Sequence, residues 1–435
     1  MKELMQSAGI LGAGGAGFPS YAKLAAGADT LVVNGAECEP LLYTDYHLLK
    51  RELSLVLAGI EAVQEFAKIP RALLSVKEHT AVKLKWTEGQ VLAKNIFVKV
   101  LPDVYPMGDE ISLIYQATGR VVKPGNLPIT AGVIVLNVET LYNAGNAVRF
   151  GKPVTETWLT IGGDVAQPIT LKVPVGTPVE TVFEKYGITV PETHTLLDGG
   201  PSMGRVIDPE TAVITKTTKG LLILPNSSPA VQSKFLDAKK SIARAETACC
   251  QCTRCTDMCP RYLLGYPLEP HKMVRTAMGA AELLPEMVIT ANLCCGCGIC
   301  ETLACCQGIS PKAVITQYKE VIAKNKIRYV ANSAVQAREE RDWRMVPSEK
   351  WESVLGVKFY DRVSVFKDEP IDVKKVEIPM KSHIGAPSVP CVKDGDRVEK
   401  GDVIATAGEG LSIAAHASIG GVAYVDGNKI TIYKE

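Results

Sequence analysis

The cysteines of this 435-residue chain are concentrated in one short region, and this constrains the fold more than any other feature of the sequence. Eleven of the thirteen cysteines fall between Cys249 and Cys306. Disulfide scaffolds are usually short secreted chains with cysteines spread throughout. The first residues here show no basic segment followed by a long apolar stretch, so we expect no secretion signal. Clustered thiols in such a chain indicate metal binding and predict a reducing, cytoplasmic location.

Two cysteine motifs have the spacing of bacterial ferredoxins that hold two [4Fe–4S] clusters. The first is C-x2-C-x2-C-x3-C-P, and the second is C-x2-C-x2-C-x4-C, with one extra residue before its last cysteine. In such proteins the fourth cysteine of each motif ligates the other cluster. The predicted ligands of one cluster are Cys249, Cys252, Cys255 and Cys305. The predicted ligands of the other cluster are Cys259, Cys294, Cys297 and Cys300.

Zinc binding is the alternative interpretation of these motifs. Zinc sites use separated C-x2-C pairs with four ligands for each ion. This chain instead has two runs of three closely spaced cysteines, each followed by a fourth, so zinc fits the spacing poorly. The spare cysteines Cys250, Cys295 and Cys306 leave the register open, and Cys306 could replace Cys305. Cys38 and Cys391 lie outside the region, and we interpret both as small buried residues.

Two adjacent clusters also predict a flavin, because clusters carry single electrons whereas a hydride carrier moves electrons in pairs. The net charge of +1 gives no indication of nucleic acid or of an anionic membrane surface as the main partner. No run of eighteen apolar residues is present, so we expect no membrane span. The composition is therefore that of an ordinary globular protein.

The length predicts several domains, and the fold class that we expect is multidomain α/β plus β. Apolar runs at 30–34, 72–76, 95–100 and 132–138, with helical spacing at 46–68, predict an α/β domain. Glycine-punctuated short strands without a helix predict an all-β barrel-sandwich domain at the end of the chain. The predicted order is the α/β domain (1–150), a β-grasp-like module (151–230), the helical two-cluster region (231–330), a connecting segment (331–375) and the barrel-sandwich domain (376–435).

A glycine-rich loop near the start, GAGGAG at 12–17, formally satisfies the G-x-G-x-x-G fingerprint, with Glu37 further on. The residues before Gly12 look helical or irregular rather than like a strand, which argues against an ordinary Rossmann unit. The smaller conclusion is that glycines let backbone N–H groups approach a phosphate or a flat ring closely. Lys23 follows at a distance suitable for a phosphate.

This loop continues as GAGGAGFPSYAKL and is followed by VVNGAECEP, by YPMGDE at 105–110 and by NVETLYN at 137–143. The four motifs resemble the flavin- and NADH-binding subunit of respiratory complex I, and more closely the RnfC protein of the Rnf electron-transport complex. The resemblance implies an FMN site made by Gly12, Gly14, Gly15, Gly17, Lys23, Asn34, Glu37, Gly108, Asp109, Glu110, Asn137 and Thr140. It also implies that Glu39 holds the ribose hydroxyls of NADH, and Glu37 and Glu110 are the candidate catalytic residues.

Simpler roles stay open for several of these residues. Glu37 and Glu39 could be acids at the start of a helix, where negative groups are favoured. Asp109 and Glu110 could form a solvated turn, and Asn137 could simply end a strand. Complex I carries an arginine where this chain has Ala13 and an acid where it has Ala36, so NADH binding is less firmly implied than FMN binding.

Domain order separates the members of this family. SHIGAP at 382–387 and AHAS at 415–418 come last here, whereas the RnfC protein has its barrel-sandwich domain first. This order resembles the PduS-type cobalamin reductases of propanediol-utilisation microcompartments, in which 151–230 would be an SLBB module. The resemblance implies electron flow from NADH through FMN and two [4Fe–4S] clusters to a corrinoid, inside a cytoplasmic microcompartment.

The implied partners are a corrinoid or a corrinoid-dependent enzyme system, with shell proteins or an adenosyltransferase as further candidates. One alternative is an Rnf-like NADH dehydrogenase that reduces ferredoxin, flavodoxin or a membrane partner. The other alternative is a non-catalytic scaffold that conducts electrons across a microcompartment shell. The acceptor rests on resemblance alone, because the sequence shows no D-x-H-x-x-G corrinoid signature.

Overall fold

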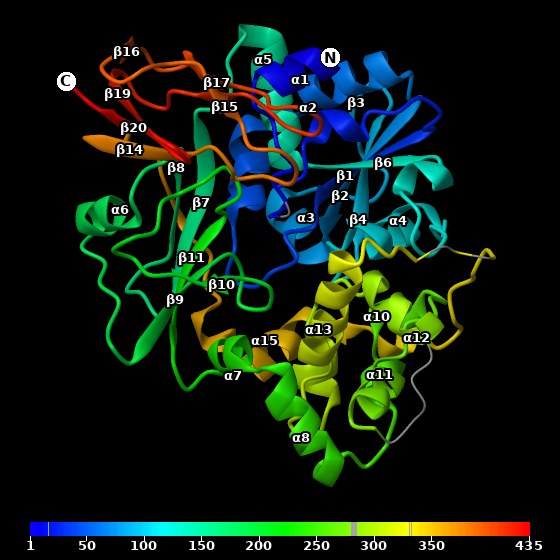
Figure 1. Cartoon of the computed structure of the whole chain (residues 1–435). Coiled ribbons are helices and arrows are strands. Elements are labelled where there is room, and N and C mark those ends of the chain that lie inside the picture. Colours follow the sequence, from blue (N-terminus) through cyan, green and yellow to red (C-terminus); the bar gives the residue numbers. More distant parts are fainter. Residues whose placement is uncertain (16, 280–284, 330, 332) are drawn as a thin grey trace.

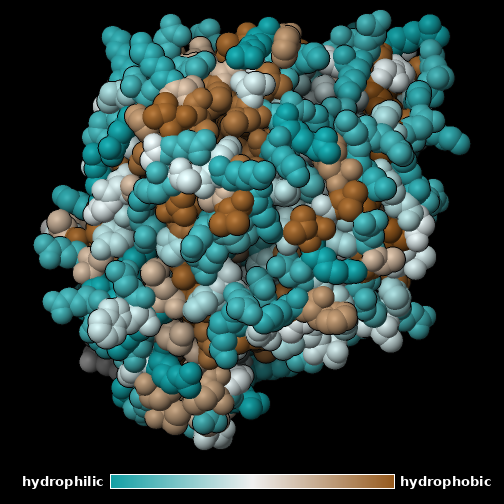
Figure 2. Space-filling model, turned by 180° about the vertical axis from the view of Figure 1, so that it is seen from behind, coloured by the Kyte–Doolittle hydropathy of each residue, from teal (hydrophilic) through white to brown (hydrophobic). Residues whose placement is uncertain are grey.

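The computed structural model describes residues 1–435 except residue 16, residues 280–284, and residues 330 and 332. Figure 1 shows an α/β group in blue and cyan, a β-rich group in green, a helical group below them in green and yellow, and the last strands in orange and red. Seen from behind, the surface is mainly hydrophilic, with hydrophobic side chains gathered toward the upper left (Figure 2). None of the described helices combines the length and the apolarity that crossing a bilayer requires.

The N-terminal group is built on a five-stranded sheet with the order β3-β4-β2-β1-β6. Strands β1 (Thr30–Gly35), β2 (Arg71–Lys77), β4 (Ile96–Leu101) and β6 (Val133–Asn137) are parallel, and β3 (Val91–Ala93) pairs antiparallel at one edge. The four predicted strands of this group are therefore confirmed. The chain enters through a short helix, α1 (Lys2–Ser7), so the expectation that no strand precedes the glycine loop is also confirmed.

Helices α2 (Thr44–Ala67) and α5 (Val138–Phe150) pack closely against each other beside this sheet. The contact depends on Gly59 and Gly145, because a methyl group at Gly59 would lie 1.9 Å from the Leu141 carbonyl oxygen and one at Gly145 would lie 2.0 Å from that of Leu55. The predicted helix at 46–68 is thus confirmed as α2. The shorter helices α3 (Glu78–Leu84) and α4 (Glu110–Thr118) complete this group.

The next group is a mixed sheet with the order β10-β9-β11-β7-β8-β13. Its own strands are β7 (Glu156–Gly163), β8 (Ile169–Pro174), β9 (His194–Asp198), β10 (Arg205–Val206) and β11 (Gly220–Pro225), and its helix is α6 (Val179–Tyr186). Strands β7 and β11 run parallel, and the other neighbours among these five are antiparallel. The short strands and the single helix predicted for this stretch are confirmed.

The cysteine region is mainly helical in its described residues, and the two motifs run through loops and short helical turns. Helix α9 (Arg254–Asp257) lies within the first motif and carries Cys255, α10 (Pro260–Leu263) follows that motif, and α13 (Pro311–Lys324) follows the second. Helices α7 (Pro229–Gln232), α8 (Ala238–Ala248), α11 (Pro270–Ala277) and α12 (Pro285–Ile289) make up the rest. The polar stretch 226–232 between the mixed sheet and this region is packed, because Ala230 and Val231 are buried.

The C-terminal residues form two small sheets without a helix, as predicted. One sheet contains β14 (Lys375–Pro379), β20 (Lys429–Tyr433), β19 (Gly421–Asp426) and β16 (Arg397–Val398), and the other contains β15 (Val389–Pro390), β17 (Val403–Thr406) and β18 (Ala415–His416). Apolar side chains of these strands share one core with those of β7, β8 and β11. The barrel-like domain is therefore fused to the preceding β-rich module.

The connecting segment is more ordered than its polar sequence suggests. Strand β12 (Val346–Pro347) pairs with β5 (Val104–Tyr105), and β13 (Val365–Lys367) extends the mixed sheet beside β8. Helix α15 (Ser348–Leu355), which lies between these two strands in the chain, buries Trp351 completely. The short helix α14 (Arg341–Arg344), which precedes β12, leaves Trp343 exposed. The segment thus connects the α/β group to the β-rich module through strand pairing with both.

Candidate functional site

The glycine loop is tied to the N-terminus of α5. The Ala13 N–H donates to the Thr140 hydroxyl at 3.1 Å, and this hydroxyl donates to the Leu11 carbonyl at 3.1 Å. Gly12 closes the loop by donating its N–H to the Phe18 carbonyl at 2.8 Å. A Cβ added at Gly14 or Gly15 would meet no described atom within 4 Å, so this part of the loop presents bare backbone to open space. Such a loop can approach a phosphate or a ring system.

Two asparagines end parallel strands next to this loop. Asn34, in β1, donates to the Gly108 carbonyl at 3.1 Å. Asn137 ends β6 and caps α5 by accepting from the Glu139 N–H at 2.8 Å, and its amide donates to the Asn34 carbonyl at 3.2 Å. The structure therefore brings the glycine loop, Asn34, Gly108, Asn137 and Thr140 together beyond the carboxyl edge of the sheet. Ligands of open α/β sheets bind at this edge.

Lys23 and Glu110 form an ion pair beside the same edge. The Lys23 ammonium lies 2.5 Å from a Glu110 carboxylate oxygen and 3.3 Å from the Val135 carbonyl oxygen. About a third of each side chain is exposed, 31% for Lys23 and 34% for Glu110, so a ligand can reach both groups. The pair supplies a cation for a phosphate and a carboxylate at the entrance to the site.

Glu37 and Glu39 are partly buried, and both carboxylates accept hydrogen bonds from the backbone. The Glu37 carboxylate accepts from the Asp45 and Tyr46 N–H groups at 2.9 and 3.1 Å, so it lies at the start of α2, as the simpler interpretation of the sequence proposed. Burial, and then the nearby Asp45 carboxylate, raise the pKa of Glu37 well above its usual value. Glu39 accepts from the Ser202 N–H at 2.8 Å, and burial raises its pKa as well. Contact with a ligand would therefore require the Glu37 carboxylate to leave its present partners, whereas Glu39 Oε1 is buried but has no partner among the described residues.

Asp109 connects the turn at 108–110 to the cysteine region. Its carboxylate caps α4 by accepting from the Ser112 N–H at 3.2 Å, and it lies 2.6 Å from the Arg261 guanidinium. The side chains of Asp109 and Arg261 are 11% and 13% exposed, so water screens this pair only weakly. The alternative of a solvated turn is therefore wrong for Asp109.

The cysteines surround two small cavities. One cavity is lined by Cys249, Cys252, Cys255 and Cys305, together with the spare Cys250 and Cys306. The other is lined by Cys259, Cys294, Cys297 and Cys300, together with the spare Cys295. The structure thus brings the predicted ligands together as the crossed scheme groups them, with Cys259 beside the second motif and Cys305 beside the first.

The two cavities differ in exposure. Cys259, Cys297 and Cys300 are buried, whereas Cys252 is exposed. We call the set Cys259, Cys294, Cys297 and Cys300 the buried quartet, and the set Cys249, Cys252, Cys255 and Cys305 the exposed quartet. Burial raises the pKa of Cys255 and of Cys259 to about 12, so these thiols ionise at neutral pH only when a cation binds.

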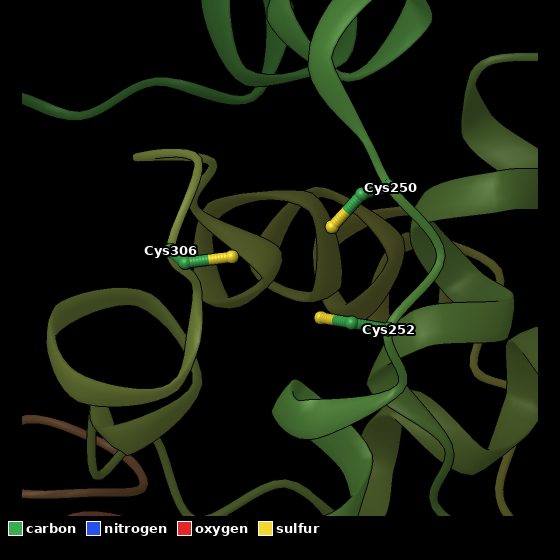
Figure 3. Close-up of side chains that lie close together, drawn as sticks. All are labelled: Cys250, Cys252 and Cys306. Atoms are coloured by element: carbon green, nitrogen blue, oxygen red, sulfur yellow. The ribbon is translucent and has the colours of Figure 1, made fainter.

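The exposed cysteines bear on which of Cys305 and Cys306 is the fourth ligand. The sulfur atoms of Cys250, Cys252 and Cys306 lie within 4.8 Å of one another and point toward a common centre (Figure 3). This geometry keeps Cys306 open as an alternative to Cys305. Among the outer cysteines, Cys391 is exposed, so our interpretation of it as a buried residue is wrong.

An open cleft of about 620 Å³ adjoins the glycine loop, a volume typical of small-molecule sites. Gly15 and Gly17 form one wall, residues 211–218 of the β-rich module form the second, and residues 381–384 of the C-terminal domain form the third. The Ile384 N–H donates to the Gly17 carbonyl at 3.0 Å, which fixes the C-terminal domain against the loop. No sequence pattern indicated that this domain contributes to a cleft, because the segments are far apart in the chain.

Comparison with known proteins adds the family. The model of the Nuo51 FMN-binding domain matches residues 5–146, the 4Fe–4S dicluster domain matches 248–310, and the RnfC barrel sandwich hybrid domain matches 356–430. Cobalamin reductase PduS of Salmonella typhimurium is 37% identical over 424 residues, which are 97% of this chain and 93% of the relative. This chain belongs to the PduS cobalamin reductase family. The PduS protein of Citrobacter freundii is 36% identical with the same coverage of both chains.

More distant relatives include the RnfC-type component of the Na(+)-translocating ferredoxin:NAD(+) oxidoreductase complex of Acetobacterium woodii. It is 31% identical over 272 residues, 60% of this chain and 58% of that one.

A solved NAD+-reducing [NiFe]-hydrogenase is 20% identical and covers 74% of this chain and 60% of that chain. The TM-score of 0.44 is too low to establish a shared fold.

Membership of the PduS family and the three domain matches confirm the predicted resemblance. They also confirm an oxidoreductase with an FMN-binding domain, a two-cluster domain and a barrel-sandwich domain, and hence the predicted cofactors FMN and two [4Fe–4S] clusters. The roles of the individual site residues stay predictions.

Proposed function

We propose that this chain is an NADH-dependent reductase that passes electrons through FMN and two [4Fe–4S] clusters to a corrinoid. The observation that carries the proposal is that three sites adjoin one another: the open cleft, the strand-edge site beside it, and the cavity of the buried quartet, which Asp109 and Arg261 join to the strand-edge site. The corrinoid is the acceptor because the relatives that share nearly the whole chain are cobalamin reductases.

FMN would occupy the carboxyl edge of the N-terminal sheet. The bare backbone at Gly14 and Gly15, with Lys23 nearby, suits its phosphate, and Asn34 and the 108–110 turn suit its ring. When bound, FMN accepts a hydride and releases electrons singly, and each cluster carries one electron at a time. Asn137 and Thr140 would hold the loop and the strand ends in place, and Glu110 would be the accessible carboxylate.

NADH would enter the cleft between the glycine loop, the β-rich module and the C-terminal domain. Gly15 and Gly17 present backbone on one side, and Lys381 supplies a positive charge on the other. Glu39, which the resemblance assigns to the ribose, accepts from the Ser202 N–H with Oε2, whereas its Oε1 is buried without a partner among the described residues, so contact with NADH would require Oε1 to become exposed. Arg205 also lines the cleft but is paired with Asp198 at 2.9 Å, which leaves Lys381 as the more available cation for phosphate.

Replacement of Lys381 tests this assignment of the cleft. We expect Lys381→Ala to raise the KM for NADH about fivefold with little change in kcat, as for the loss of about 1 kcal/mol from an exposed charge contact. Lys393→Ala, in the same domain but outside the cleft, is the control and should leave KM unchanged. If Lys381→Ala kept the KM for NADH of the unmodified protein, as Lys393→Ala should, NADH would bind elsewhere.

The fourth ligand of the exposed quartet is tested by a pair of variants. We propose Cys305, whose sulfur accepts from the Ile309 N–H at 3.4 Å, as cluster sulfurs commonly do. Cys305→Ala should therefore lose one cluster, while Cys306→Ala should keep the full iron and sulfide content of protein purified without oxygen. The reverse result would assign the ligand to Cys306.

The proposed domain limits are those predicted from the sequence, with an SLBB module of the β-grasp type at 151–230. The order β8-β7-β11-β9-β10, with a parallel central pair and one helix after the first hairpin, supports that assignment. Membership of the PduS family supports a place in a cytoplasmic propanediol-utilisation microcompartment, where shell proteins or an adenosyltransferase are the candidate partners.

Anaerobic mixing of the flavin-loaded holoprotein with NADH and cob(III)alamin tests the proposed function. We expect the flavin absorbance to bleach with NADH alone and the corrinoid spectrum to change when cob(III)alamin is added. If an artificial dye were reduced without any change in the corrinoid spectrum, the assignment as an NADH dehydrogenase would stand and the assignment of a corrinoid as the acceptor would be rejected. No bleaching by NADH would favour the electron-conducting scaffold.

A further inference from the structure

Arg261 is a buried cation between the proposed flavin site and the buried quartet. It lies in α10, two residues after Cys259, and its guanidinium lies 2.6 Å from Asp109 of the 108–110 turn. The guanidinium also lies over the Tyr266 ring, 5.6 Å from the ring centre, which restricts its orientation. One side of the group is therefore held by the flavin-binding domain, and the other side lines the cysteine cavity.

One donor of this guanidinium is unused. Within the described part of the chain, the Arg261 Nε–H is buried and has no hydrogen-bond partner. A buried donor without a partner is destabilising by about 1–3 kcal/mol, and more for a charged group, so such donors are normally matched. The cavity beside Arg261 is lined by the sulfurs of the buried quartet and by Cys295. A negatively charged, sulfur-rich group in this cavity would supply the missing acceptor.

A second contact joins the same two parts of the protein. The Tyr105 hydroxyl, two residues before Met107 in the YPMGDE motif, donates to the Cys297 carbonyl at 2.8 Å. Its ring stacks on Trp351 with the ring centres 4.7 Å apart, so it is held firmly. In contrast, the described residues that line the cavity of the exposed quartet all come from the cysteine region itself. These contacts therefore join the buried quartet, and not the exposed one, to the flavin-facing turn.

We propose that Arg261 donates to the cluster of the buried quartet and raises its reduction potential, so that this cluster is the first acceptor of electrons from the flavin. The inference rests on the proposed function for the source of the electrons. Positive charge and hydrogen bonds near a cluster favour its reduced, more negative state. Electrons from the flavin would reach the cluster of the buried quartet first and that of the exposed quartet second, and Cys252 of the exposed quartet lies at the surface, where an external acceptor can approach.

The test is an EPR-monitored redox titration of the anaerobic holoprotein with dithionite. Arg261→Gln should shift the midpoint potential of the buried cluster to lower values and leave that of the exposed cluster unchanged. Asp109→Asn should shift the buried cluster in the opposite direction, because it removes the negative charge that offsets Arg261. A purely structural ion pair would not produce opposite shifts. The signal lost in Cys297→Ala identifies the buried cluster, because Cys297 belongs to the second motif and lines that cavity.

Arg338→Gln is the matched control, because Arg338 stacks on Tyr262 of the same helix, 3.8 Å from the ring centre, without lining the cavity. Arg261→Lys retains the charge and should shift the potential less than Arg261→Gln does. It also provides the test if Arg261→Gln folds poorly. An unchanged potential in the Arg261 variants, or a shift confined to the exposed cluster, would overturn the proposal. Because dithionite supplies the electrons, this result is independent of whether NADH is the donor.

Discussion

Cys259→Ala should abolish the cluster built mainly by Cys294, Cys297 and Cys300, although Cys259 belongs to the first motif. The reason is spatial: Cys259 lines the cavity of the second motif, and Cys305 lines that of the first. Iron and acid-labile sulfide should fall to about half, since one of two four-iron clusters is lost. Electron transfer from NADH to a corrinoid should fall almost to background, because the buried cluster is the proposed first acceptor.

Cys391→Ala is the control for this experiment, since Cys391 is an exposed thiol of the C-terminal domain. It should retain the full iron content and both EPR signals. Loss of the exposed cluster in Cys259→Ala, with the buried one intact, would contradict the crossed arrangement.

Gly14→Val should prevent flavin binding without disturbing the fold. A Cβ added at Gly14 meets no described protein atom within 4 Å, and the backbone there is not in the left-handed region that requires glycine. The added methyl groups would instead fill the space in which the FMN phosphate or ring approaches the backbone. We expect the affinity for FMN to fall about a hundredfold, equivalent to about 2–3 kcal/mol, as measured by flavin fluorescence titration.

Gly420→Ala provides the comparison, because Gly420 is an exposed glycine in the C-terminal domain with only ordinary contacts around an added methyl group. Its affinity for FMN should be unchanged, and both variants should unfold at the same temperature as the unmodified protein. Full flavin affinity in Gly14→Val would mean that FMN does not approach this part of the loop.

Local sequence patterns were enough to predict most elements of the fold. The apolar runs that became β1, β2, β4 and β6 are short, buried and bounded by polar residues, which is typical of parallel strands. The connecting segment was harder, since β12 and β13 are formed by pairing with β5 and β8 and not by a local pattern. Trp351 gave no periodic signal because its burial depends on Tyr105, far away in the chain.

The candidate site shows the same division. Cysteine spacing predicted both quartets, because a cubane cluster imposes its own geometry on the loop that holds it. The Asp109–Arg261 pair could not be predicted, since 152 residues separate the partners and each has an ordinary local explanation. Glu37 was assigned to the flavin by resemblance, whereas the structure places its carboxylate on the first turn of α2. Side-chain partners of this kind depend on tertiary packing, which one sequence does not reveal.

Metal analysis of the chain purified without oxygen tests the central claim most directly. Two cubane clusters in the two quartets predict about eight iron atoms and about eight acid-labile sulfides for each polypeptide, in equal amounts. One or two zinc ions for each polypeptide, with no labile sulfide, would contradict the account and make the cysteines structural zinc ligands.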